Sequence, residues 1–254
     1  MSVQDLSGRR IIVTGGASGM GEGLVRAFPA LGARVVSLDL VEESGRAIAE
    51  EAGASFHQVD VSDQASVDHA IDTAVTTLGG LDVLIHAAGI APFAPSESTP
   101  LDLWNTVMAI NATGTMLTNQ AAFRHLKADG GAILNFASAA GLDGLPRKAA
   151  YSASKGAVLA WTRTVAAEWG QHGITVNAIA PAIWTPMYDK TRSEMSEEQL
   201  VQHDAVMAQR IPIGGQLGDI AKDFVPVMAF YSSEGAGFVT GQTISIDGGT
   251  LKVR

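Results

Sequence analysis

Residues 10–21 read RIIVTGGASGMG, a short apolar run followed by a glycine-rich turn. The run 10–14 is rich in β-branched residues, which is typical of a strand buried on both faces of a sheet. Gly15, Gly19 and Gly21 allow the backbone to turn tightly and to approach a pyrophosphate, whose charge the start of the next helix favours. The order strand, loop, helix therefore predicts a dinucleotide site, with a plain turn as the alternative.

The alternation of strand-like and helix-like segments continues along the chain. We expect further strands at 34–39, 55–60, 81–86, 132–138, 174–179 and 243–246. We expect helices from the glycine loop to Ala30 and at 42–52, 64–78, 101–127, 151–170 and 219–231. Such alternation predicts an α/β, Rossmann-type doubly wound parallel sheet with helices on both faces, formed as a single domain over 1–254.

Composition excludes several classes of protein. The chain has 254 residues, of which 46% are hydrophobic, and this is enough for one sizeable core. Its net charge of −9 and the lack of any lysine or arginine cluster argue against a nucleic-acid partner. With no cysteine and no metal-ligand spacing among six histidines, we expect neither disulfides nor a metal site.

The chain also lacks the sequence features of membrane and secreted proteins. No run approaches the roughly 20 apolar residues that a membrane span needs. No apolar segment follows a basic start, so we expect no signal peptide and a cytoplasmic location.

Asp39 ends the second predicted strand. A carboxylate at this place accepts hydrogen bonds from an adenosine ribose and repels a 2′-phosphate. Ala17, Ser18 and Leu40 supply no basic group that would bind such a phosphate, so NAD is favoured over NADP. The alternative is that Asp39 is only a solvated strand end.

Tyr151 and Lys155 are spaced by four residues at the start of a predicted helix, and this spacing places them on one face. Ser138 ends the preceding strand, at the carboxyl edge where α/β sheets carry their sites. Taken singly, Tyr151 is also compatible with an interface aromatic and Ser138 with a helix cap. Their position downstream of the glycine loop makes the three residues a candidate site.

At this point the whole chain closely resembles the classical short-chain dehydrogenase/reductase (SDR) family. The resemblance depends on an ordered set of motifs: TGGASGMG (14–21), Asp39, Asp60-Val61, HAAG (86–89), Asn111, Ser138, YSASK (151–155), the segment 181–185 and Asp247-Gly-Gly. It implies an oxidoreductase in which Tyr151 exchanges a proton with the substrate oxygen. Lys155 would bind the nicotinamide ribose and lower the tyrosine pKa, Ser138 would hold the substrate oxygen, and Asn111 would support a proton relay.

The resemblance also implies where NAD binds. The expected contacts are Gly15, Ser18, Gly19, Met20, Gly21, Asp39, Leu40, Asp60, Val61, Ala87, Ala88, Gly89, Tyr151, Lys155, Pro181, Ile183 and Thr185. Two segments depart from the family pattern. His86-Ala87 stands where the family has two asparagines, so we interpret His86 as structural and expect rebuilt hydrogen bonds. The segment 181–185 stands where the family has a Pro-Gly start, and it is one residue shorter than the family segment. This difference affects the expected nicotinamide contacts of Ile183 and Thr185.

The substrate is expected above the nicotinamide, against mostly apolar walls. The candidates are Ile90, Pro92, Phe93, Ala139, Leu142, Leu145, Trp184, Met187 and Tyr188, together with Ser138 and Tyr151. With no arginine beyond Arg147 in the nearby stretches, a hydrophobic, uncharged, cyclic or aromatic secondary alcohol fits better than a sugar phosphate. The polar segment 181–210 is expected to be a mobile loop with short helices, so that about 184–213 form a flexible lid.

Three functions remain open at this point. The first is an NAD-dependent secondary-alcohol dehydrogenase, in a homotetramer with residues 101–127 and 151–170 at one interface. The second is a reductase of 3-oxoacyl thioesters or other carbonyls, which Asp39 disfavours because biosynthetic reductases usually take NADPH. The third is a dinucleotide sensor without turnover, which the intact set of Ser138, Tyr151 and Lys155 disfavours.

Overall fold

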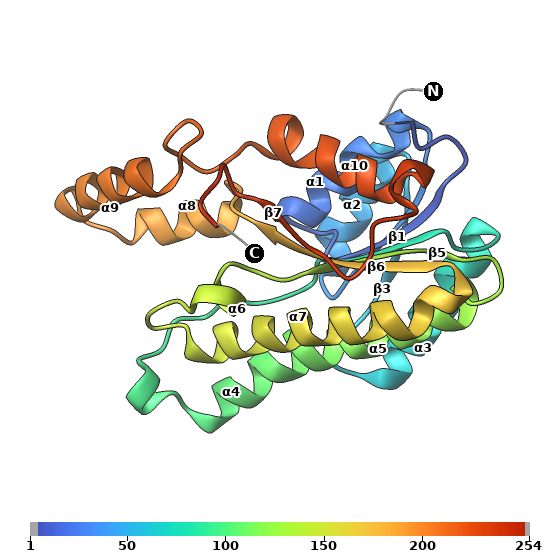
Figure 1. The fold of residues 1–254 in the computed structure, drawn as a ribbon, viewed down its shortest axis with the longest axis horizontal. Helices are drawn as coiled ribbons and strands as arrows, with labels where there is room; N and C mark the ends of the chain where they lie inside the picture. Colours follow the sequence, from blue (N-terminus) through green and yellow to red (C-terminus); the bar gives the residue numbers. More distant parts are fainter. Residues whose placement is uncertain (1–4, 252–254) are drawn as a thin grey trace.

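The computed structural model describes residues 5–251. Residues 1–4, on which the signal-peptide prediction partly depends, lie outside the described residues, as do 252–254. The described chain forms a seven-stranded sheet in the order β3-β2-β1-β4-β5-β6-β7 (Figure 1). All neighbouring strands pair in parallel. The strand order reverses between β1 and β4, and ligands of such sheets bind where the order reverses, at the carboxyl ends of the strands.

The strands are short and mostly apolar, as expected for a sheet covered on both faces. Their bounds are β1 (Arg10–Thr14), β2 (Arg34–Asp39), β3 (Ser55–Gln58), β4 (Val83–His86), β5 (Gly131–Phe136), β6 (Ile174–Pro181) and β7 (Thr243–Ile246). The predicted strands 55–60 and 132–138 are too long at the carboxyl end and 81–86 at the amino end, because these outer residues belong to loops at the sheet edges. The predicted strand 174–179 is two residues too short at its carboxyl end.

Helices cover both faces, which confirms the predicted fold class (Figure 1). One face carries α3 (Gln64–Leu78), α5 (Gly114–Leu126) and α7 (Ala149–Trp169), packed on Ile12 and Leu84. The other carries α1 (Gly19–Ala27), α2 (Glu42–Ala52) and α10 (Val225–Ser232), packed on Ile11 and Val83. Alternate residues of a strand thus supply the two cores.

Three predicted helices are interrupted. The helix after the glycine loop ends at Ala27, and a 3₁₀ turn, η1 (Pro29–Leu31), follows it. The predicted helix 101–127 is α4 (Leu101–Val107), a π-helical turn η3 (Met108–Thr113) and α5. The predicted helix 219–231 begins with a second π-helical turn, η5 (Ile220–Phe224), ahead of α10. Periodicity alone does not separate an α-helix from one that contains a π turn.

The segment after β6 contains two helices. It forms α8 (Pro186–Ser193) and α9 (Glu197–Arg210), at the left of Figure 1. Ser196 and Gln199 form a reciprocal capping box at the start of α9. This motif satisfies two backbone donors and defines the start of a helix.

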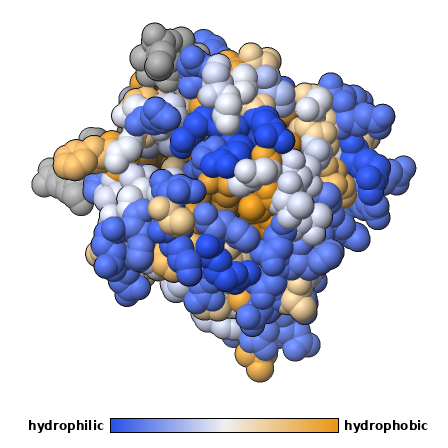
Figure 2. Space-filling view, turned by 90° about the vertical axis from the view of Figure 1, so that its right-hand side faces the viewer, coloured by the Kyte–Doolittle hydropathy of each residue, from blue (hydrophilic) through white to orange (hydrophobic). Residues whose placement is uncertain are grey.

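The remaining short elements are η2 (Ser96–Ser98), α6 (Ala140–Asp143), η4 (Gly170–His172) and η6 (Glu234–Ala236). Figure 2 views the molecule from the right-hand side of Figure 1, away from α8 and α9, and shows mostly hydrophilic side chains around a small apolar area. None of the helices in the described range is both long and apolar enough to cross a bilayer.

Candidate active site

The glycine loop between β1 and α1 leaves a cradle at the carboxyl end of the sheet. Gly15 has a φ of 72°, and a Cβ there would lie 2.7 Å from the nitrogen of Ala88. A Cβ at Gly21 would lie 2.1 Å from the carbonyl oxygen of Gly15. Both positions therefore require glycine for steric reasons. Ser18 is the exposed N-cap of α1 and its side chain makes no capping hydrogen bond, so the hydroxyl is available to a ligand.

Asp39, at the end of β2, is fixed beside this loop. One carboxylate oxygen accepts a hydrogen bond from the nitrogen of Ala17 at 3.0 Å, and the other accepts one from the nitrogen of Val41 at 3.0 Å. These bonds orient the carboxylate and leave further lone pairs for a ligand.

Asp60 and Val61 follow β3. The Asp60 carboxylate accepts hydrogen bonds from the nitrogen and hydroxyl of Ser62, at 2.9 and 2.6 Å. Val61 is buried, and a Cβ at Gly114 would approach it to 3.1 Å. The start of α5 thus closes this side of the site.

His86 ends β4 and takes over the bracing expected of an asparagine. Its Nδ1 lies 3.0 Å from the hydroxyls of both Thr14 and Thr118. Thr14 in turn accepts a hydrogen bond from the nitrogen of Ala88 at 3.3 Å. Burial, with a smaller contribution from the charge of Lys155, lowers the pKa of His86 to about 3. The imidazole is therefore neutral and structural.

Asn111 lies in the π turn η3 and is fully buried. Its amide exchanges two 2.9 Å hydrogen bonds with the backbone of Ile90 and donates a third to the hydroxyl of Ser154 at 3.0 Å. The extra residue of a π turn re-aims side chains, and such turns are frequent at functional sites. Here the turn fixes the loop after β4.

Tyr151, Lys155 and Ser138 meet at the other end of the site. The Lys155 ammonium is buried, donates to the carbonyl of Phe136 at 2.6 Å and lies 5.7 Å from the Tyr151 ring centroid. Burial lowers the pKa of Lys155 to about 8. Burial raises the pKa of Tyr151, and a hydrogen bond with Ser138 opposes that shift only in part.

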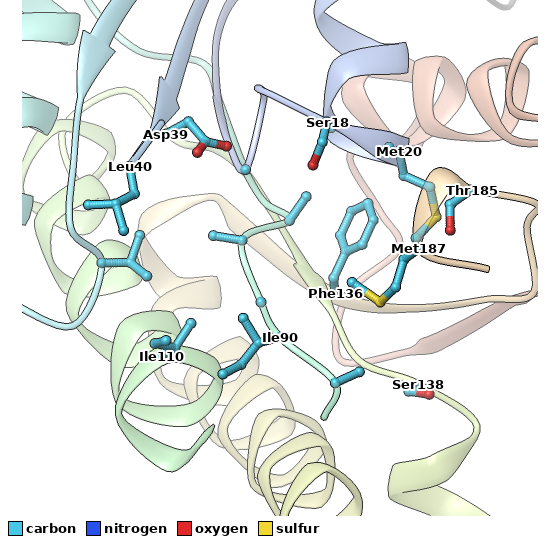
Figure 3. Close-up of a pocket in the computed structure, with 18 of the residues that line it drawn as sticks. Ser18, Met20, Asp39, Leu40, Ile90, Ile110, Phe136, Ser138, Thr185 and Met187 are labelled. Carbon is cyan, nitrogen blue, oxygen red and sulfur yellow. The ribbon is translucent and has the colours of Figure 1, made fainter. Parts of the chain in front are cut away.

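These groups line one cavity with a volume of about 370 Å³. Asp39 and Leu40 lie at one end and Ser138 at the other, with Ile90 between them (Figure 3). A site of this shape can hold an extended ligand along the carboxyl edge of the sheet.

Comparisons with known proteins identify the family of the chain. A family model described as "Enoyl-(Acyl carrier protein) reductase" matches residues 15–250. D-threitol dehydrogenase of Mycolicibacterium smegmatis is 34% identical over 97% of this chain and 95% of its own length. Trans-4-hydroxycyclohexanecarboxylate dehydrogenase of Sinomonas cyclohexanicum is 34% identical over 94% of this chain and 91% of its own length.

A solved structure has the same fold. It is a short-chain type dehydrogenase/reductase from Mycobacterium ulcerans, with a TM-score of 0.88 and 26% identity over 96% of this chain and 90% of that one. This chain belongs to the classical SDR family. It is therefore an oxidoreductase, and the SDR family uses nicotinamide dinucleotide cofactors. The predicted resemblance is confirmed.

Most of the SDR residues expected to contact the cofactor line the cavity. They are Gly15, Ser18, Gly19, Met20, Gly21, Asp39, Leu40, Asp60, Val61, Ala87, Ala88, Gly89, Tyr151, Lys155, Pro181 and Thr185. Ile183 does not: it is buried, packs in the core and pairs with Gly218. The cavity also has an apolar lining that the sequence did not predict. It comes from residues at or after the ends of strands and from η3: Val59, Ala91, Ile110, Phe136 and Ala137.

Of the expected substrate walls, Ile90, Ser138, Tyr151 and Met187 line the cavity. The others do not line it: Pro92, Phe93, Ala139, Leu142, Leu145, Trp184 and Tyr188. Trp184 and Tyr188 instead pack edge to face, with ring centroids 4.9 Å apart, and Tyr188 hydrogen bonds to His203 of α9 at 2.6 Å. These contacts join α8 to α9.

Proposed function

We propose that this SDR protein is an NAD-dependent oxidoreductase that interconverts a hydrophobic secondary alcohol and its ketone, with Tyr151 as general acid and base. The observation that carries the proposal is the shared cavity. Tyr151, Lys155 and Ser138 line one end of it, and Asp39 with the glycine loop lines the other. This arrangement would hold a cofactor and a carbinol in contact.

The residues present fit a nicotinamide dinucleotide. Side chains at Gly15 or Gly21 would collide with the backbone of Ala88 or Gly15, so only glycine allows this tight turn, and the Ser18 side chain has no capping role there. We assign the pyrophosphate to this cradle, the adenosine ribose to Asp39 and the nicotinamide ribose to Lys155. When bound, the nicotinamide supplies the hydride acceptor or donor.

The proton is assigned to Tyr151. Its phenolate oxygen would take the proton of the substrate hydroxyl during oxidation and return it during reduction, while Ser138 holds the same substrate oxygen. Burial alone opposes a phenolate, since it raises the pKa of Tyr151. The nearby Lys155 ammonium favours the phenolate, because an opposite charge stabilises the ionised form. Asn111 would act indirectly, by fixing Ile90 and Ser154 around the helix start.

Asp39 and Leu40 support NAD over NADP. The fixed carboxylate would accept ribose hydroxyls and repel a 2′-phosphate. A double variant, Asp39→Ser with Leu40→Arg, is expected to raise the NADP-to-NAD ratio of kcat/KM at least about tenfold, which is the effect of roughly one charged contact. The paired control is Leu40→Gln alone. An unchanged cofactor ratio in the double variant would show that Asp39 does not face the ribose.

The apolar lining at the Tyr151 end supports a substrate with an apolar body. Two similar proteins bear names of dehydrogenases of hydroxylated compounds, a tetritol and a hydroxycyclohexanecarboxylate. The alternative, reduction of a 3-oxoacyl thioester or another carbonyl, uses the same residues. The description of the matching family model, an enoyl reductase, fits less well, because the family's enoyl reductases space their tyrosine and lysine more widely than Tyr151 and Lys155.

The test is NADH formation over a panel of cyclic, aromatic and aliphatic secondary alcohols, beside a Tyr151→Phe variant. We expect at least one substrate, and a loss of roughly 100-fold or more in turnover in the variant with NADH binding retained. Tyr231→Phe is the matched control, because Tyr231 lies on α10 and does not line the cavity. Turnover retained by Tyr151→Phe would refute the proton-transfer assignment.

We further propose a cytoplasmic homotetramer with α4, α5 and α7 at one interface, and closure of the segment 184–213 over the substrate. The exposure of Leu101 and Trp104 on α4 supports the interface. Sedimentation equilibrium tests the assembly, and a monomer would contradict it.

A further inference from the structure

Lys148 lies beside Tyr151 of the candidate active site, although it does not itself line the cavity. Its ammonium is 4.0 Å from the centroid of the Phe93 ring and 5.6 Å from that of Tyr151. Tyr151 lines the cavity, and the loop that carries Phe93 leaves the cavity at Ile90 and Ala91. A positive charge therefore stands beside the ring that we assign to proton transfer.

Two loops hold this lysine in place. Ala94 and Lys148 form an isolated parallel bridge, and the nitrogen of Ala94 donates to the carbonyl of Arg147 at 2.9 Å. Arg147 has a φ of 62°, the left-handed region that non-glycine residues adopt only at a cost of about 1 kcal/mol or more. The strained residue thus lies at the point where the loop after β5 pairs with the loop after β4. Such strain is often found beside ligand sites.

The charge of Lys148 faces two aromatic rings but no carboxylate among residues 5–251. None of the ion pairs formed within residues 5–251 includes it. It is half-buried, and burial lowers its pKa. Lys148 is also the N-cap of α7, with no capping hydrogen bond from its side chain and no acidic residue in the first turn.

Helix stability does not account for a lysine here. Helix starts favour serine, threonine, aspartate and asparagine at the N-cap, and negative rather than positive charge. A residue that violates a local rule without a local gain is often functional. Lys148 does contact Phe93 through its ammonium, which lies over the ring, but this cation–π contact leaves the positive charge without an anionic partner.

We propose that Lys148 binds a carboxylate of the substrate, at the end remote from the carbinol. The inference rests on the proposed function, because Tyr151 fixes where the carbinol lies. It specifies the hydrophobic secondary alcohol of the proposed function as a hydroxy acid with an apolar body, in place of the uncharged alcohol expected from the sequence. Because the chain carries a net charge of −9, its overall field repels anions, and recognition of a carboxylate needs a local cation.

The first test measures binding without turnover. Cyclohexanecarboxylate and the neutral cyclohexanecarboxamide are titrated calorimetrically into the NADH-loaded protein. We expect the carboxylate to bind at least about tenfold more tightly, as for one charge-assisted hydrogen bond. Lys148→Met should reduce the carboxylate-to-amide ratio to about one, and Lys148→Arg should retain most of it. Equal affinities in the wild-type protein would overturn the proposal.

Arg147→Asn is the matched control, since it removes one positive charge from the adjacent residue and asparagine tolerates a positive φ. It should keep the wild-type ratio. Equal losses in Arg147→Asn and Lys148→Met would indicate a diffuse field and would overturn the assignment to Lys148.

The second test uses cyclohexanols with a carboxylate or a carboxamide at the opposite ring carbon. We expect the carboxylate preference to appear as a lower KM that Lys148→Met raises. The two proposals fail separately. A carboxylate preference in binding without oxidation of any alcohol would refute the proposed function and support the anion subsite. Turnover with no such preference would refute the subsite and support the proposed function.

Discussion

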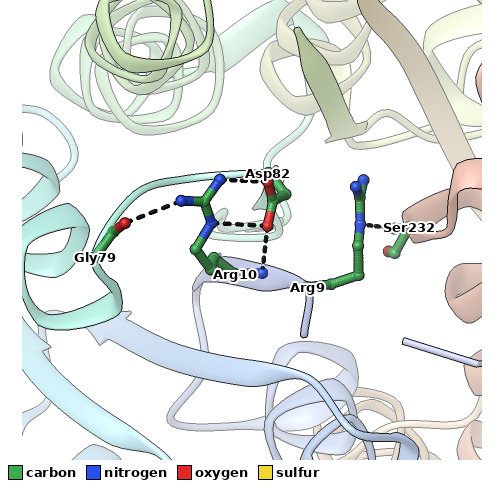
Figure 4. Close-up of polar contacts among 5 residues, drawn as sticks. All are labelled: Arg9, Arg10, Gly79, Asp82 and Ser232. Atoms are coloured by element: carbon green, nitrogen blue, oxygen red, sulfur yellow. Dashed lines mark hydrogen bonds and ion pairs between the residues drawn. The ribbon is translucent and has the colours of Figure 1, made fainter. Parts of the chain in front are cut away.

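At the amino-terminal end of the sheet Arg10 lies against Asp82, whereas at the carboxyl-terminal end Lys148 and Lys155 face no carboxylate among the described residues. The Arg10 guanidinium donates to both Asp82 oxygens, at 2.9 and 2.7 Å, and to the carbonyl of Gly79 at 2.9 Å (Figure 4). Arg9 beside it donates to the carbonyl of Ser232 at 3.1 Å. Lys155 has only the carbonyl of Phe136, at 2.6 Å.

The two ends of the sheet therefore use positive charge in different ways. A bidentate arginine–carboxylate pair satisfies both partners within the protein and so contributes to stability. A buried ammonium with one neutral acceptor keeps an uncompensated charge, which raises the free energy of the folded state and is typical of functional sites. We therefore expect substitutions at the amino-terminal end to change stability, and those at the carboxyl-terminal end to change turnover.

The largest expected effect follows from Lys155→Met. Removing the ammonium takes away the opposite charge that favours the Tyr151 phenolate, while burial still opposes ionisation, so Tyr151 becomes a weaker proton acceptor at neutral pH. We expect kcat/KM to fall about 100- to 10,000-fold, the usual contribution of a positioned acid or base. Arg10→Met is the control and should keep the wild-type value. Comparable losses of kcat/KM in the two variants would remove the distinction between the two ends.

The second-largest effect concerns His86, at the carboxyl end of β4, and the dependence of the free energy of unfolding on acid pH. The pKa of His86 is about 3 in the folded protein, against 6.5 for an ordinary histidine. Between these values the unfolded chain binds more protons, so the free energy of unfolding falls as the pH decreases. We expect this to remove roughly 2–5 kcal/mol of stability between pH 6.5 and 3.

In His86→Asn the free energy of unfolding should not show this fall between pH 6.5 and 3. The asparagine side chain does not titrate, and its amide oxygen can accept a hydrogen bond from Thr14 or Thr118. Urea unfolding at several pH values measures the difference in slope. His69→Asn, at an exposed position, is the control and should follow the wild type. Parallel curves for His86→Asn and the wild type would show that His86 is not held neutral by burial.

The sequence predicted the features that depend on local pattern. The β-branched run 10–14, the glycines after it and the pair Tyr151 and Lys155 each specify a strand, a turn or a helix face within a few residues. The order of such segments along the chain was enough to predict the doubly wound sheet. The family is confirmed as well, whereas the roles of the individual site residues stay predictions.

Features set by tertiary contacts escaped the sequence analysis. The π turn that places Asn111 has the same composition as an α-helix, and only the packing of α5 against Val61 and α7 distinguishes the two. The family resemblance implied that Ile183 contacts the cofactor, but Ile183 pairs with Gly218 and packs in the core instead. Lys148 could not be recognised from the sequence, because the role proposed for it depends on its contact with Phe93, which lies on a separate loop.

The smallest effect is expected at the amino-terminal end. Arg10→Met leaves the partly buried Asp82 without its main donor, and we expect the free energy of unfolding at pH 7 to fall by about 1–2 kcal/mol. Burial alone would raise the pKa of Asp82, but the hydrogen bonds and charge of Arg10 outweigh it and lower that pKa below 3.8. The stabilisation is therefore present above the ordinary carboxyl range and is lost as the pH falls through the lowered value. Urea unfolding of both proteins at pH 7 and pH 3 measures this, and the gap between them should narrow in acid. A constant gap would mean that the loss comes from packing of the arginine stem, and the amino-terminal end would then owe its stability to burial instead of paired charge.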